Sequence, residues 1–236
     1  MPLQPIKIWG HWGGPNPWKV IMLLEELSLP YDLELVEFAD VKKPEYLQVT
    51  PNGRLPTIQD PNTGVRLWES AAIILYLIEQ YDKKHTFSYG GQDQLHERHL
   101  CQQWLAFQAT TQGPYYGQAT WFARFHGEKL PSAIERYVAE ILRVIGVLEE
   151  GLARNDGKVE TGCWLVGDKC TYADLAFVTW AGVGEGLLLE LGRADTEGLR
   201  EEYPRYTAWM AAMRAREKVA WCAERIAEGR SAHGLR

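Results

Sequence analysis

Apolar residues in the first eighty positions follow two spacings, one typical of strands and one typical of helices. Strands are expected at 6–9, 31–36, 55–58 and 65–68. Helices are expected at 17–27 and 69–81, with a short helix near 44–49. The order is β-α-β-α-β-β-α, which predicts an α/β domain built on one sheet with helices on both faces.

A different pattern begins after 82–91, a polar, glycine-ended segment without an apolar period that is the predicted linker. Beyond it, the chain shows only helical spacing. Helices are expected at 95–112, 118–125, 134–152, 175–183, 204–214 and 217–228. Gly113-Pro114 is expected to break the first of them, and Thr171 to Asp174 has the spacing of a capping box. The sequence predicts an α/β domain at 1–84 and an all-helical domain at 92–236.

Charge is spread evenly over a chain of 236 residues with a net charge of −6, since 1–84 and the remainder are each net −3. No basic stripe is present to neutralise phosphates, so we expect no nucleic-acid partner. The longest apolar run, 71–78, is far shorter than the roughly 18 residues that span a bilayer. Without a charged and apolar leader at the start, the chain is expected to be cytoplasmic with no membrane partner.

The cysteines argue against metal or disulfide chemistry. Their positions are Cys101, Cys163, Cys170 and Cys222. No pair has the two-residue spacing of a zinc site or redox dithiol, so we expect free thiols. His96 and His99 lie three residues apart, but a single pair lacks further ligands, so we expect no metal.

Gly14-Pro15-Asn16-Pro17 joins the first strand to the first helix. Asn16 has the character of an N-cap with Pro17 at the first helical position. The free N–H groups and partial positive charge of that helix start would suit an anion such as a thiolate. The alternative is that both residues only begin the helix.

Thr50-Pro51-Asn52-Gly53-Arg54-Leu55-Pro56 precedes a β-type run. Pro56 is a candidate for a cis peptide bond, because X-Pro bonds adopt that form at low cost. Such a bond would turn the backbone of Leu55 outward to pair with an extended ligand. A plain turn with an edge-strand proline remains the alternative.

Trp68-Glu69-Ser70 leads a strand directly into a helix. The N–H and hydroxyl of Ser70 could bind a carboxylate, and Glu69 could bind an ammonium group. Together they would hold the two ends of an α-amino acid. Helix capping by the same two residues is the alternative.

In these motifs the chain resembles the cytosolic glutathione S-transferase family, and in particular its fungal branch around the yeast nitrogen-regulator prion protein and the related bacterial nu class. The resemblance extends to Pro44-Glu45-Tyr46 and to the Thr171 capping box. It implies a thioredoxin-like N-terminal domain, a helical C-terminal domain and a homodimer. Glutathione would bind between the two domains as cosubstrate, with no other cofactor.

The resemblance also implies roles for single residues. Glu69 and Ser70 would hold the γ-glutamyl end of glutathione, and the Leu55 backbone would hold its cysteinyl part. Lys43 would meet the glycyl carboxylate, and Arg136 resembles a basic position that faces the site in some relatives.

The chain departs from many members of the family because no Tyr, Ser or Cys occurs between Gly10 and Lys19. Asn16 takes that place, and its amide would donate a hydrogen bond to the sulfur. A hydrogen bond to a charged group is worth about 1.5–3 kcal/mol, which lowers a thiol pKa by roughly one to two units. Without a cysteine there, a deglutathionylating mechanism lacks its nucleophile.

Aromatic residues are the candidates for an electrophile pocket. They are Trp12, Tyr115, Tyr116, Trp121 and Phe122. Either tyrosine could also polarise a leaving group or assist the thiolate. The alternative is that these side chains belong to the core.

Three functions fit this pattern. The first is a glutathione transferase that activates the thiol for attack on a small hydrophobic electrophile. The second is a glutathione-dependent peroxidase or disulfide-bond reductase. The third is a non-catalytic binding or regulatory protein with the same fold. The sequence leaves open both the electrophile and the choice between detoxification and a step of secondary metabolism.

Overall fold

The computed structural model describes residues 2–155 and 164–233, which divide into two compact units. The first, called the sheet unit, comprises Met1–Lys84 together with Ala215–Arg236. The second, called the helical unit, is His85–Arg214. The last helix, within Ala215–Arg236, therefore belongs to the sheet unit, although in sequence it follows the helical unit.

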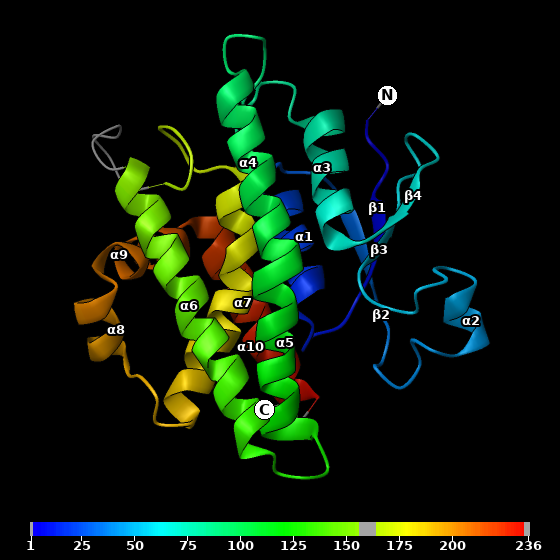
Figure 1. Cartoon of the computed structure of the whole chain (residues 1–236). Helices are drawn as coiled ribbons and strands as arrows, with labels where there is room; N and C mark the ends of the chain where they lie inside the picture. Colours follow the sequence, from blue (N-terminus) through cyan, green and yellow to red (C-terminus); the bar gives the residue numbers. More distant parts are fainter. Residues whose placement is uncertain (1, 156–163, 234–236) are drawn as a thin grey trace. The chain divides into compact units, whose positions relative to one another are not determined.

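The sheet unit has the predicted α/β character (Figure 1). Its elements are β1 (Ile6–Gly10), α1 (Pro15–Glu26), β2 (Tyr31–Leu35), α2 (Pro44–Leu47), β3 (Thr57–Gln59), β4 (Arg66–Trp68), α3 (Ser70–Tyr81) and α10 (Glu217–Ala232). The strands lie in the order β2-β1-β3-β4. β1 runs parallel to β2 and antiparallel to β3, which is antiparallel to β4. The expected fold class of this half is confirmed.

The core of the sheet unit forms where apolar faces of α1 and α3 meet each other and the sheet. Ile8 and Ile58 lie opposite each other on β1 and β3, and both are fully buried. Leu24 on α1 and Leu77 on α3 are also fully buried, as their helical spacing predicts. Burial of such side chains is the main favourable contribution to folding.

Helix α10 packs against α1. The Arg216 guanidinium donates to both carboxylate oxygens of Glu26, at 2.6 and 2.9 Å. Gly229 lies under the ring of Trp12, because a Cβ there would come within 2.1 Å of the indole. The absence of a side chain at Gly229 therefore allows the close approach of α10 to the segment after β1.

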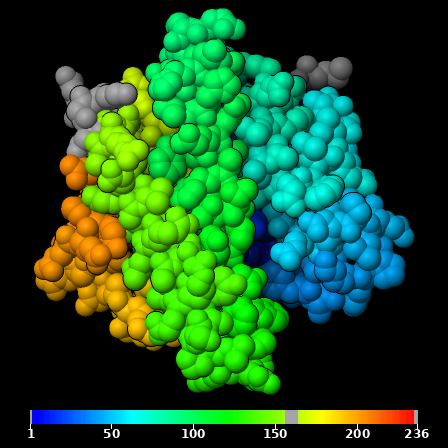
Figure 2. Space-filling view, viewed as in Figure 1, coloured from blue at the N-terminus to red at the C-terminus, as the bar shows by residue number. Residues whose placement is uncertain are grey.

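The described residues of the helical unit contain no strand. Its elements are α4 (Leu95–Phe107), η1 (Gln108–Gln112), α5 (Gly113–Thr120), η2 (Trp121–Phe125), α6 (Pro131–Asn155), α7 (Tyr172–Glu190), α8 (Thr196–Glu202) and α9 (Pro204–Arg214). Figure 2 shows the face on which α4, α5 and α6, drawn in greens, form a continuous surface. The expected all-helical character is confirmed for the described residues.

The expected break at Gly113-Pro114 is wrong. The chain stays helical from α4 to η2, and η1 is a π-helical turn in which the Gly113 N–H donates to the Gln108 carbonyl five residues back. Pro114 then lies in the first turn of α5, where its missing N–H costs little. The widened turn accommodates the proline without ending the helix.

The expected capping box is confirmed at the start of α7. The Thr171 N–H donates to Asp174 Oδ2 at 2.8 Å, and the Ala173 N–H donates to Thr171 Oγ1 at 3.3 Å. Asp174 Oδ1 accepts from the Leu165 N–H and from Trp209 Nε1, each at 3.0 Å. This buried carboxylate therefore joins α7 to the preceding loop and to α9.

Other boundaries differ from expectation in ways that concern the site. Helix α1 begins at Pro15 with Gly14 as its N-cap, so Asn16 lies inside the first turn and is not the cap. Strand β3 begins at Thr57, so Leu55 lies in the loop before it. Helix α8 was not expected, because its short polar sequence buries only Leu199.

Candidate glutathione site

The turn between β1 and α1 positions Asn16. The Gly14 N–H donates to the His11 carbonyl at 3.1 Å, and the Gly13 N–H donates to His11 Nδ1 at 3.0 Å. A Cβ at Gly10 would come within 2.9 Å of the Leu33 side chain, so a glycine at the end of β1 allows close packing against Leu33 of β2. Asn16 is half-buried in the first turn, where the helix dipole favours negative charge.

Glu69 has an unusual backbone conformation between β4 and α3. Its φ is +68° and its ψ is 111°, a region that L-residues with side chains rarely adopt. Its side chain makes no capping hydrogen bond to α3. Instead, Oε1 accepts from Asn52 Nδ2 at 3.0 Å, and the side chain is exposed. Residues in such conformations concentrate at functional sites, and this geometry disfavours the alternative that Glu69 acts as a side-chain cap.

Two further predicted residues are connected to the Glu69 carboxylate. Ser70 follows Glu69 in sequence, and Leu55 lies in the loop that contains its hydrogen-bond partner Asn52. Ser70 is the first residue of α3 and is buried. The Leu55-Pro56 peptide bond is cis, which was one of the two alternatives at this proline, and Leu55 is half-buried. Because Asn52 lies in the loop that contains Leu55 and bonds Glu69, the structure brings these two predicted segments together.

Lys19 has no role predicted from the sequence, but its environment in the structure is exceptional. It lies on α1 one helical turn after Asn16 and is only 2% exposed. Burial lowers the pKa of Lys19 to about 7, and the negative charge of Glu69 offsets part of that effect. The Glu69 carboxylate therefore has an amide donor on one side and a buried lysine within electrostatic reach. The sequence did not single out Asn52 or Lys19 as neighbours of the candidate site, because neither has a distinctive spacing.

Lys43 is exposed immediately before α2. It forms an ion pair with Asp40 at 2.5 Å, which raises the pKa of Lys43 above its ordinary value. Ion pairs at such exposed positions are worth little, so Asp40 leaves Lys43 able to turn toward an added carboxylate.

Two of the predicted residues of the helical unit lie together. The guanidinium of Arg136 lies over the ring of Tyr115, 5.6 Å from its centroid, and pairs with Glu140. Tyr115 is half-buried and lies 6.2 Å from Tyr137, whose ring stacks on Phe122 at 5.6 Å. These rings form a partly exposed aromatic cluster beside a cation.

The remaining aromatic candidates are placed differently. Tyr116 is 1% exposed, and its hydroxyl donates to the Ile141 carbonyl at 3.3 Å, so it lies in the core of the helical unit. Trp121 is 50% exposed on η2. Trp12 belongs to the sheet unit, where it stacks on Trp18 at 5.5 Å between ring centroids.

The described cysteines are poor nucleophiles. Cys101, Cys170 and Cys222 are buried free thiols, and Cys163 lies outside the described residues. Burial raises the pKa of Cys101 and that of Cys222 to about 12, so neither is a thiolate at neutral pH. Within the described part of the chain, no group of three or more metal-ligating side chains occurs. None of the described helices is long and apolar enough to cross a membrane.

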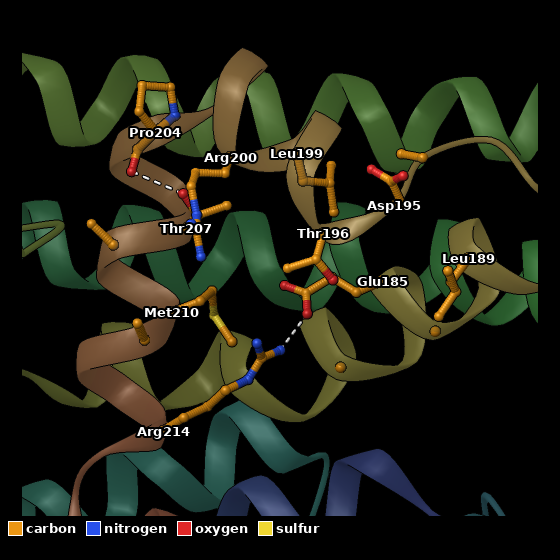
Figure 3. Close-up of a pocket in the computed structure, with 15 residues that line it drawn as sticks. Glu185, Leu189, Asp195, Thr196, Leu199, Arg200, Pro204, Thr207, Met210 and Arg214 are labelled. Carbon is orange, nitrogen blue, oxygen red and sulfur yellow. Dashed lines mark hydrogen bonds and ion pairs between the residues drawn. The ribbon is translucent and has the colours of Figure 1, made fainter.

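A cavity of about 700 Å³ lies within the helical unit between α7, α8 and α9 (Figure 3). At its edge Arg214 pairs with Glu185, which also accepts from the Tyr206 hydroxyl at 2.7 Å. Gly182 and Gly186 of α7 line it, and a Cβ at either would meet no atom within 4 Å. None of the predicted site residues lines this cavity, so it is separate from them.

Comparison with known proteins places this arrangement in one family. The family described as "Glutathione S-transferase, N-terminal domain" matches residues 13–80, and "Glutathione S-transferase, C-terminal domain" matches residues 114–217. The chain is similar to glutathione S-transferase-like protein gedE of Aspergillus terreus, at 48% identity over 92% of this chain and 93% of that protein.

Solved structures agree with the sequence relatives. Glutathione transferase URE2P6 of Phanerochaete chrysosporium, in complex with oxidized glutathione, has a TM-score of 0.85 at 41% identity and covers 96% of this chain and 98% of its own. Ure2p5 of the same organism, cocrystallised with 1-(S-glutathionyl)-2,4-dinitrobenzene, has a TM-score of 0.82 at 37% identity, with 98% of each chain covered. The chain therefore belongs to the glutathione S-transferase family.

Proposed function

We propose that this protein is a glutathione transferase that activates the thiol of glutathione for attack on a small hydrophobic electrophile. The observation that carries the proposal is the arrangement around Glu69. Glu69 is the N-cap residue of α3 and has a strained backbone conformation, but its exposed carboxylate makes no capping hydrogen bond and lies beside Ser70 in sequence. A paired anion and helix N-terminus suit the ammonium and carboxylate of an α-amino acid.

Glutathione would bind along the sheet unit in an extended form. Its γ-glutamyl ammonium would meet Glu69, and its γ-glutamyl carboxylate would meet the N–H and hydroxyl of Ser70. The cysteinyl backbone would pair with Leu55, next to the cis bond, and the glycyl carboxylate would meet Lys43. The sulfur would then lie at the first turn of α1, within reach of the Asn16 amide.

The chemistry follows from the charge on sulfur. Loss of the thiol proton to solvent leaves a thiolate, which forms a carbon–sulfur bond with the electrophile while the leaving group departs with its bonding electrons. A hydrogen bond from Asn16 worth about 1.5–3 kcal/mol lowers the thiol pKa by roughly one to two units. The dipole of α1 acts in the same direction.

The electrophile is proposed to meet the aromatic side chains. In the helical unit, Tyr115 and Phe122 belong to a partly exposed cluster beside Arg136, and Trp121 is exposed nearby in sequence. Such surfaces suit a small apolar molecule. We also propose that the protein is a cytoplasmic homodimer, which light scattering of the purified protein and fluorescence imaging of a tagged copy would test.

Conjugation of glutathione to 1-chloro-2,4-dinitrobenzene tests the proposal, because the expected product is the conjugate named for the Ure2p5 complex. We expect wild-type turnover, and a kcat about tenfold lower for Asn16→Ala at neutral pH because the thiolate fraction falls. Glu69→Ala should mainly raise the KM for glutathione. Intact glutathione binding without conjugation would favour a binding or regulatory protein instead.

A second use of the same site is reduction of peroxides or disulfide bonds. It is favoured by the URE2P6 complex, whose ligand is oxidized glutathione. There the thiolate would attack a disulfide sulfur, form a mixed disulfide and release the other sulfur as a thiolate. Parallel assays with an aryl halide, a peroxide and a disulfide substrate would rank the activities. Turnover of the peroxide or disulfide substrate alone would replace the proposed transferase function.

A further inference from the structure

Asn52 joins two segments that the proposed function assigns to different parts of glutathione. Its Nδ2 donates to Glu69 Oε1 at 3.0 Å across 17 residues of sequence. Asn52 lies three residues before Leu55, whereas Glu69 leads into α3. The hydrogen bond therefore connects the loop before β3 to the turn after β4.

The backbone of Asn52 and Gly53 has contacts that restrict it. Lys42 Nζ donates to the Asn52 carbonyl at 2.7 Å. The next residue, Gly53, has a φ of +55°, and a Cβ there would come within 2.5 Å of the Val41 carbonyl oxygen. Only glycine fits such a position, so the turn at 52–53 has little freedom. The amide of Asn52 is thus presented to Glu69 by a constrained loop.

Glu69 depends on this contact for its orientation. Its side chain is exposed and makes no capping bond, and its Oε1 accepts from Asn52 Nδ2 at 3.0 Å. Lys19 acts on it electrostatically but belongs to the buried face of α1. A carboxylate on a flexible, exposed side chain loses rotamer freedom when it binds a ligand, and a prior hydrogen bond reduces that cost.

We propose that Asn52 is a positioning residue for glutathione, which orients the Glu69 carboxylate toward the ligand ammonium and couples it to the Leu55 segment. The inference rests on the proposed function, because it assigns Glu69 to the γ-glutamyl end. Oε1 is occupied by the amide, and Oε2 is presented to the ammonium. Binding would cover this exposed hydrogen bond, exclude water from it and strengthen it.

Calorimetric binding of S-methylglutathione tests the proposal, since this probe retains the γ-glutamyl group and has no thiol to titrate. We expect Asn52→Ala to weaken binding about tenfold, which corresponds to about 1.4 kcal/mol. Asn52→Asp should weaken it further, because two carboxylates would then face each other. In the conjugation assay, Asn52→Ala should raise the KM for glutathione and leave kcat at saturating glutathione unchanged.

A double-mutant cycle separates positioning from a general effect on the loop. Combined with Glu69→Ala, Asn52→Ala should cause no further loss of binding, because it acts through the carboxylate that is already absent. Gln59→Ala is the matched control, since it removes an amide that bonds Arg66 on β4 and does not contact Glu69. It should bind like the wild type.

Each outcome has a distinct meaning. An unchanged affinity in Asn52→Ala, or an equal loss with and without Glu69, would overturn the positioning role. Binding of the probe without conjugation would overturn the transferase function while the cycle still decides the role of Asn52. No binding of the probe by the wild type would overturn both.

Discussion

Removal of the Asp174 carboxylate is the sharpest test of how the helical unit is held together. The side chain is fully buried and accepts four hydrogen bonds. The donors are the Leu165 N–H, the Thr171 N–H and hydroxyl, and Trp209 Nε1, at 2.8–3.0 Å. Asp174→Ala would leave three N–H groups in the core without this acceptor, while the hydroxyl can rotate.

The magnitude follows from those three donors. Each buried donor without a partner costs about 1–3 kcal/mol, and water entering the vacated space recovers part of the loss. We expect a loss of about 4 kcal/mol, a large share of the roughly 5–15 kcal/mol that stabilises a typical domain. Asp174→Asn should lose less, about 2 kcal/mol, because its carbonyl can still accept from two donors while its amide faces the other two.

Urea unfolding followed by far-ultraviolet circular dichroism measures these losses. Asp195→Ala is the matched control, because Asp195 is an exposed aspartate that caps α8 through the Gly198 N–H at 2.8 Å. Loss of such a cap costs about 1 kcal/mol. If Asp174→Ala were no more destabilising than Asp195→Ala, the buried carboxylate would not join α7 to the preceding loop and to α9 as its contacts indicate.

Two other perturbations test local packing and buried charge. Gly184→Ala should destabilise by about 1–3 kcal/mol, because its Cβ would lie 2.4 Å from the buried Tyr116 ring. Gly186→Ala, on the same helix with no atom within 4 Å, should stabilise by up to about 1 kcal/mol, and equal effects in urea unfolding would contradict this packing. For Lys19, whose pKa is lowered by burial to about 7, the unfolded chain binds more protons between about pH 7 and pH 10, so the free energy of unfolding should rise with pH in that window. Lys19→Met should abolish this rise in unfolding curves measured across the window, and a persistent rise would assign it to another group.

Local chemistry made much of the sheet unit predictable. The alternation of strand and helix signals predicts the four strands and three of the helices of this unit. Buried residues such as Ile8 and Leu77 recur at the ordinary spacing of a strand or a helix. The cis bond at Pro56 could be named only as a candidate, because every X-Pro bond can adopt that form at low cost. The start of α1 was not predictable, since Pro15 and Pro17 can each occupy a first helical turn.

Longer-range relationships were beyond a single sequence. The pattern of α10 predicts a helix, but nothing in it indicates that Gly229 packs under Trp12 in the other part of the chain. Likewise, the spacing of apolar residues around Gly113 does not show which of Tyr115 and Tyr116 is buried. Only the fold shows that Tyr116 is buried against Gly184 while Tyr115 stays partly exposed beside Arg136.

In the candidate site, too, some residues could be predicted from the sequence and others only from the fold. Glu69 and Ser70 stand out in sequence because a strand leads directly into a helix there. Asn52 does not, because an asparagine before a glycine is also typical of an ordinary turn. Its contact with Glu69 depends on how two loops meet, which is a property of the folded sheet.

The pKa of the glutathione thiol in complex with the protein tests the central claim most directly. Ultraviolet absorbance of the thiolate, measured against pH for the wild type and for Asn16→Ala, gives that value. We expect a wild-type pKa roughly one to two units below the ordinary value of about 8.5, and a return toward that value in Asn16→Ala. A thiol that titrates at the same pH in both proteins would contradict the role of Asn16.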